Sequence, residues 1–125
     1  MNKMKLIEFR IENEENFKPT LSFPNPQPVL ITFDCESTGI VPGETNLTIT
    51  YDITGNSANI LFDNGTTKLV KTKTLQSTND DVSDSINFIK GENNSDTSNT
   101  FTVSSIANLP NTKGLPADNF DVKII

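Results

Sequence analysis

The sequence predicts an all-β fold, an antiparallel sandwich of about seven to nine short strands. Short segments in which apolar and polar residues alternate recur along the chain, and this period of two is typical of half-buried strands. Clusters of Asn, Asp, Gly and Pro separate the segments at intervals of roughly eight to fifteen residues. The 125 residues fit a single domain by length.

The clearest strand covers residues 47–53. One side of it carries four apolar residues, Leu47, Ile49, Tyr51 and Ile53, and the other side is polar. The last strand, residues 120–124, repeats this alternation. Further strands are expected at residues 6–11, 29–33, 58–62, 67–75 and 101–106. A shorter segment at 20–23 lies between prolines and suits only an edge strand or an extended arm. Together these segments are enough for two packed sheets.

A hairpin is expected at Asn64-Gly65, which separates the segments 58–62 and 67–75. Asn-Gly accepts positive φ at both central positions of a tight turn. The second of these segments carries Lys68, Lys71 and Lys73, and lysines are typical of strands at the edge of a sheet. We therefore expect an edge strand here, with these lysines available to a partner.

The segment around residues 80–89 has two interpretations. Val82, Ile86 and Ile89 recur at helical spacing, and Asp80 or Asp81 would cap a helix. As a strand, the same segment places Ile86 and the following Phe88 on one side. The pattern favours a strand, or a short helical turn that leads into one.

The N-terminal part differs from the rest, which divides the chain into residues 1–26 and residues 27–125. A strand is followed there by a segment with four prolines, Pro19, Pro24, Pro26 and Pro28. Proline-rich segments are stiff and extended, so an arm is expected that wraps its own domain or reaches a neighbour. The prolines are candidate partner contacts, and deletion of residues 1–26 would then leave a folded sandwich.

The composition argues against catalysis. The chain has no histidine, no tryptophan and a single cysteine, Cys35, which excludes Ser-His-Asp catalysis, imidazole metal sites and an intrachain disulfide. We expect a buried or merely tolerated thiol, no catalytic residue, no cofactor and no enzyme. Asp80, Asp81 and Asp84 are weak calcium candidates, since calcium takes clustered carboxylate oxygens; the alternative is an acidic loop.

Charge and hydropathy limit the partners. The net charge of −6 and a pI near 4.5 argue against nucleic acid, which needs clustered Lys and Arg. No apolar stretch reaches the roughly 18 residues of a membrane span, and the first residues lack the apolar region of a secretory signal. Other protein subunits are the expected partners.

Two segments resemble known modules. Val41-Pro42-Gly43-Glu44 followed by Leu47-Thr48-Ile49-Thr50 resembles the turn and second strand of bacterial immunoglobulin-like modules. The end of the chain, with Leu109-Pro110 and residues 120–124, is similar to the closing strands of fibronectin type III modules. The resemblance implies an immunoglobulin-like sandwich, although the usual disulfide cysteines and core tryptophan are absent.

The resemblance extends to the immunoglobulin-like accessory proteins of tailed bacteriophages. It implies a non-enzymatic structural protein of the virion, a capsid auxiliary or decoration protein that is assembled in the host cytoplasm and contacts a major capsid protein, a tail protein or itself. Two alternatives stay open: a carbohydrate-binding or adhesive module, and a scaffold domain that binds proteins through its sheet edges.

Overall fold

A computed structural model describes residues 3–12, 17–55, 60–91 and 100–125. All regular elements within these ranges are β-strands, and none of the described residues is helical. In chain order the strands are β1 (Lys5–Ile11), β2 (Thr20–Leu21), β3 (Val29–Thr38), β4 (Asn46–Thr54), β5 (Ile60–Phe62), β6 (Lys68–Thr74), β7 (Asn79–Ile86), β8 (Phe88–Lys90), β9 (Thr100–Asn108), β10 (Leu115–Pro116) and β11 (Phe120–Ile124). The predicted all-β class is confirmed.

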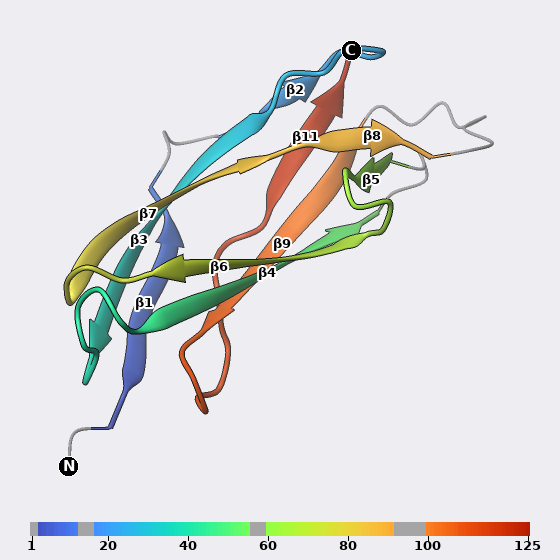
Figure 1. Ribbon diagram of the computed structural model, residues 1–125. Coiled ribbons are helices and arrows are strands. Elements are labelled where there is room, and N and C mark those ends of the chain that lie inside the picture. Colours follow the sequence, from blue (N-terminus) through green and yellow to red (C-terminus); the bar gives the residue numbers. More distant parts are fainter. Residues whose placement is uncertain (1–2, 13–16, 56–59, 92–99) are drawn as a thin grey trace.

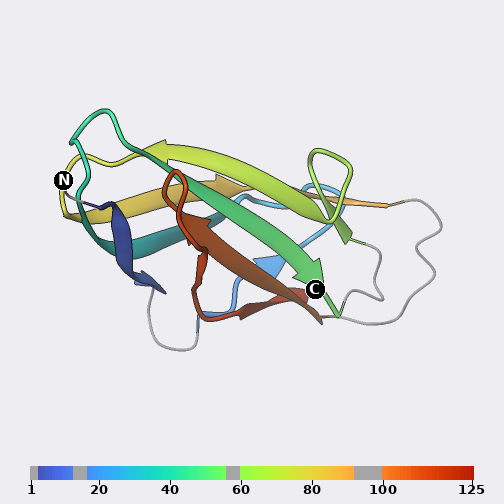
Figure 2. The same ribbon diagram turned by 90° about the horizontal axis from the view of Figure 1, so that it is seen from below.

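The strands form two larger sheets and a small one (Figure 1). One sheet has the order β1-β3-β7 and is antiparallel throughout. The other has the order β2-β11-β9-β4-β6, with β10 also paired to β9. Its pairs are antiparallel except for β2, which runs parallel to β11. Strands β5 and β8 form the small sheet, at the end of the molecule away from β1 (Figures 1 and 2).

The core lies between the two larger sheets. Along β4 the burial alternates strictly, and Leu47, Ile49 and Tyr51 are fully buried. The ring of Tyr51 lies 6.2 Å from that of Phe33 on β3, so the two sheets contact each other through their inner sides. Several antiparallel sheets around one apolar core are compatible with a β-sandwich.

The predicted hairpin between residues 58–62 and 67–75 is wrong as a strand pairing, and Ala58 lies outside the described residues. Strand β5 pairs with β8, whereas β6 pairs with β4 along its whole length. The turn itself is present, with Gly65 at φ 83°. The long β4–β6 ladder offers many more backbone hydrogen bonds than the three residues of β5 could provide. The turn therefore carries the chain from one sheet to another.

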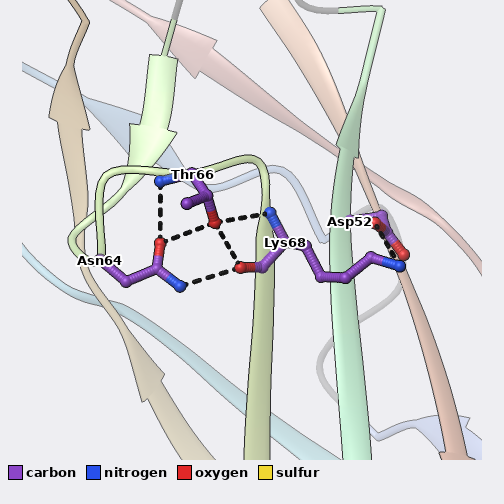
Figure 3. A network of polar contacts seen from close by, with 4 residues as sticks. All are labelled: Asp52, Asn64, Thr66 and Lys68. Carbon is purple, nitrogen blue, oxygen red and sulfur yellow. Dashed lines mark hydrogen bonds and ion pairs between the residues drawn. The ribbon is translucent and has the colours of Figure 1, made fainter.

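The side chains of Asn64 and Thr66 shape this turn (Figure 3). Asn64 Oδ1 accepts hydrogen bonds from the Thr66 backbone amide at 2.9 Å and from Thr66 Oγ1 at 3.0 Å. Asn64 Nδ2 donates to the Lys68 carbonyl oxygen at 2.9 Å. These bonds satisfy backbone groups locally and fix the start of β6.

The segment 79–90 is extended, and the helical interpretation is wrong. Strands β7 and β8 follow each other directly, with Ile86 and Phe88 buried and Ile89 40% exposed. The pairing of β7 with β3 runs from Val29↔Ile86 to Glu36↔Asn79. The local spacing of apolar residues also permits a helix. The long ladder with β3 explains why this segment forms a strand instead.

The N-terminal segment shares the core of the rest of the chain. Leu6 and Phe9 on β1 are buried, and the ring of Phe9 stacks on Phe33 at 4.3 Å. Leu21 on β2 is completely buried beside β11. The arm was expected either to wrap its own domain or to reach a neighbour, and its described residues wrap their own domain. The boundary between residues 26 and 27 stays a prediction, but both sides contribute to one core.

Candidate interaction surface

The structure does not bring the three calcium candidates together. They lie on β7, where Asp80 and Asp84 face inward and Asp81 faces outward, because successive side chains of a strand point to opposite sides. Asp80 Oδ2 accepts a hydrogen bond from the Gln76 backbone amide at 2.8 Å. Among the described residues, no three acidic or cysteine side chains are grouped so that they could hold a metal ion. The calcium interpretation loses its geometric basis, and the acidic-loop alternative is replaced by a strand.

Asp84 instead links the two larger sheets. Its side chain is 3% exposed, and the Tyr51 hydroxyl on β4 donates to Oδ2 at 2.9 Å. Lys73 Nζ on β6 lies 3.3 Å from Oδ1, and the Ser85 backbone amide also donates to Oδ1 at 2.9 Å. A buried carboxylate is tolerated only when it is paired and hydrogen-bonded, and here both oxygens have partners.

The environment of Tyr51 gives the first prediction. Burial, followed by the negative charge and hydrogen bond of Asp84, raises the pKa of the Tyr51 hydroxyl far above its ordinary value of 10.0. The folded state therefore holds this proton more tightly than the unfolded state. The stability that follows is fully present below pH 10 and is lost as the pH rises above it.

Tyr51 is the only tyrosine, so ultraviolet absorbance of tyrosinate reports on this residue alone. We expect no ionisation in an alkaline titration until circular dichroism shows that the protein unfolds. The Tyr51→Phe variant supplies the background absorbance. Reversible ionisation near pH 10 with an intact dichroism spectrum would contradict the buried environment.

The lysines of the predicted edge strand have intramolecular roles. Strand β6 is at the edge of its sheet, as predicted. Lys68 Nζ lies 3.8 Å from Asp52 Oδ1, and Lys73 pairs with Asp84. Lys71 and Lys73 line an open groove of about 520 Å³ between β6 and β7. Inward-facing lysines discourage another strand from adding to this edge. Partner contact at Lys68, Lys71 and Lys73 stays a prediction.

The four candidate prolines lie on either side of β2, one before it and three between β2 and β3. The Pro19 carbonyl accepts a hydrogen bond from the Lys123 backbone amide at 3.0 Å. Pro24 and Pro28 are exposed and Pro26 is half-buried, in the connection between β2 and β3. Pro19 therefore supports the fold, and partner contact through these four prolines stays a prediction.

Cys35 is buried on the inner side of β3, as the sequence predicts for a lone thiol. Burial raises its pKa to about 12, with smaller contributions from nearby aspartates. A thiol with so high a pKa is protonated at neutral pH and is a poor nucleophile. Cys35 is thus part of the core.

The outer sides of the two larger sheets differ in charge. On the β1-β3-β7 sheet, Glu8 lies opposite Glu36, and Asp34 lies opposite Asp81. Arg10 bridges part of this group, with Nη2 at 2.9 Å from Asp34 Oδ2 and Nε at 3.2 Å from Glu8 Oε1. Like charges directly across a sheet repel each other, so this side, which we call the acidic face, keeps a negative potential.

The outer side of β6, β4 and β9 is rich in hydroxyl groups, and we call it the hydroxyl face. Its Thr and Ser residues are Thr48, Thr50, Thr54, Thr72, Thr74, Thr100, Thr102 and Ser104. The register sets Thr50 opposite both Val70 on β6 and Ile106 on β9, which are 56% and 43% exposed. The face thus has a central row in which Thr50 lies between two exposed apolar residues, and Pro116 on β10 continues this row beyond Ile106. Its neighbouring row holds the Asp52–Lys68 ion pair (Figure 3).

Sequence reasoning found the polar side of residues 47–53 but missed the hydroxyl face as a unit. The alternating threonines of β4 were the visible signal. What joins them to Val70 and Ile106 is the register of three strands that are far apart in sequence. That register depends on strand pairing, which local alternation does not determine.

Most of the aromatic residues are buried. The chain has eight phenylalanines and one tyrosine. Phe17 and Phe23 are half-buried, and the others are buried. Sugar-binding platforms generally use exposed aromatic rings, and this surface offers the partly exposed rings of Phe17 and Phe23 alone.

No family model matches the chain, and no curated protein matches it. Among the described residues there is no helix that is long and apolar enough to cross a membrane.

Proposed function

We propose that this protein is an immunoglobulin-like module that serves as a non-enzymatic structural protein of a virus particle, an auxiliary or decoration subunit of a tailed-phage capsid. The strand order supports the immunoglobulin-like part. Such domains place their first, second, fourth and fifth strands in one sheet and their third, sixth and seventh in the other. Among the described residues of this chain, no strand takes the place of the fourth. Counting the main strands, β1, β3 and β7 share one sheet here, whereas β4, β9 and β11 share the other. Strand β6 lies beside β4, where variable-type domains add a strand.

The hydroxyl face carries the functional proposal. It is a broad sheet surface with short side chains and two exposed apolar residues, Val70 and Ile106. Short, β-branched side chains lose little conformational entropy when a partner covers them. A contact surface of this kind suits a subunit that is held in an assembly. The acidic face, on the opposite sheet, suits the side that remains in solvent.

The scaffold alternative shares this face and differs only in the partner. Binding of a partner strand at the β6 edge is less favoured, because Lys71 and Lys73 point inward there. The distinction therefore depends on whether the protein enters a particle.

Mass spectrometry of purified particles tests the proposal. Particles from cells that express this chain with its neighbouring genes should contain it at a fixed ratio to the major capsid protein. The Thr50→Arg variant, which places a long charged side chain at the centre of the hydroxyl face, should fold normally and be absent from the particles. Thr32→Arg on the acidic face is the matched control and should be incorporated. Absence of the unmodified chain from the particles would overturn the proposal.

A further inference from the structure

We propose that two copies of this protein associate through their hydroxyl faces. This inference goes beyond the proposed function, because it concerns the free protein, in which a second copy occupies the face that the shell would cover in a particle. The starting observation is the central row of the face. Val70 and Ile106 are exposed on either side of Thr50, Pro116 on β10 lies opposite Ile106, and the outward residues of the adjoining rows are polar. Exposed β-branched residues in register form a surface that another sheet can cover.

Charge favours a second copy at this face over the acidic face. Each chain carries a net charge of −6, so a contact that brings the acidic groups of two copies together adds repulsion, whereas a neutral contact adds none. On the hydroxyl face Asp52 is paired with Lys68. On β11, at its margin, Asp121 is followed two residues later by Lys123, and both are exposed. Contact through this face keeps the two acidic faces on the outside, at the largest separation.

The polar rows indicate the symmetry of the pair. Consider a two-fold axis that lies between the two faces and runs parallel to the central row. It would set Val70 against the partner's Val70 and Ile106 against the partner's Ile106. The adjoining rows would then face each other, so that Asp52 meets the partner's Thr48. An axis along the strands would instead place Asp52 against the partner's Asp52. Like charges at an interface cost several kcal/mol, so the first arrangement is favoured, and it is isologous, as a two-fold contact must be.

The size of the face predicts the strength of the contact. With outward residues about 6.8 Å apart along a strand and strands about 4.8 Å apart, β4 and its neighbours offer an area on the order of 600 Å² per copy. Two copies would bury on the order of 1,200 Å², at the lower limit of specific interfaces. We therefore expect a weak dimer, with a dissociation constant in the micromolar range.

Sedimentation equilibrium over a range of protein concentrations tests this inference. The unmodified chain should change from monomer to dimer in the micromolar range. Val70→Asp and Val70→Lys, each measured alone, should weaken the dimer about tenfold or more, since each places like charges on the two-fold axis. Leu30→Asp is the matched control, because Leu30 is 68% exposed on the other sheet, and it should leave the dissociation constant unchanged. Circular dichroism checks that each variant folds.

Mixing the two charged variants tests the axis. An equimolar mixture of Val70→Asp and Val70→Lys should regain dimers, because the opposite charges then meet at the axis. Failure to regain them would overturn the proposed symmetry. A monomer at every concentration up to the millimolar range would overturn self-association and leave the face to a different protein. An effect of Leu30→Asp equal to that of Val70→Asp would place the contact elsewhere.

Discussion

Deletion of residues 1–26 is expected to abolish folding. The deletion removes β1 and β2, and with them Leu6, Phe9 and Leu21 from the common core. Burial of a large apolar side chain stabilises by about 1.5–3 kcal/mol, so three of them represent much of a total stability of about 5–15 kcal/mol. The deletion also exposes the inner surface of β3 beneath Phe9 and leaves the edge of β11 unpaired. The buried contacts thus reverse the expectation from sequence that the remaining chain would fold.

Urea denaturation followed by circular dichroism measures this effect. The truncated chain should show no cooperative transition. Because a truncation can fail for other reasons, Leu21→Ala in the full chain is a finer test and should cost about 2–5 kcal/mol. Its neighbour Thr20→Ala, on the exposed side of β2, should stay within about 0.5 kcal/mol. A cooperative transition of the truncated chain with unchanged stability would show that the N-terminal segment is separable.

Replacement of Asp84 by alanine is expected to cost about 3 kcal/mol of unfolding free energy. The variant leaves the Tyr51 hydroxyl buried without its acceptor and the Lys73 ammonium without its counter-ion. Breaking a buried pair by removal of one partner costs about 3–5 kcal/mol. The lower end applies because the Lys73 side chain is 31% exposed and can turn toward water. Chemical denaturation at neutral pH measures the change.

The matched control is Asp81→Ala, on the same strand and facing outward. Asp81 lies opposite Asp34, so its removal relieves a like-charge contact and should leave stability within about 0.5 kcal/mol or raise it slightly. The double variant Tyr51→Phe/Asp84→Ala should cost less than the sum of the single changes, since both remove the same hydrogen bond. Equal losses of unfolding free energy in Asp81→Ala and Asp84→Ala would contradict the role of the buried contacts of Asp84.

Local patterns predicted most strands and their buried sides correctly. In β4 the apolar positions are the buried ones, and in β11 Phe120 and Val122 are buried while Asp121 and Lys123 are exposed. A strand's side chains alternate with a period of two, so a few residues suffice to assign its faces. The edge position of β6 was also visible, because its lysines are a local feature.

The partners of the strands were not predicted from local patterns. The Asn64-Gly65 turn exists, yet β5 and β6 belong to different sheets. The segment with Leu21 is an edge strand, one of the two alternatives expected for it, but its parallel pairing with β11 at the far end of the sequence was not predicted. Which strands pair depends on contacts between residues distant in sequence, and these follow from the global packing of the core.

The hydroxyl face and the buried contacts of Asp84 also combine features that the sequence predicts with features that it does not. By itself the sequence determined the all-β class, the inward and outward positions of most strands, and the lack of histidine chemistry, because each follows from local alternation or from composition. Only the tertiary structure decided that Asp84 joins Tyr51 and Lys73 in the core while Asp81 remains outside. It also decided that Val70, Thr50 and Ile106 form one row. The physical reason is that register between strands is set by long-range pairing, which no single segment contains.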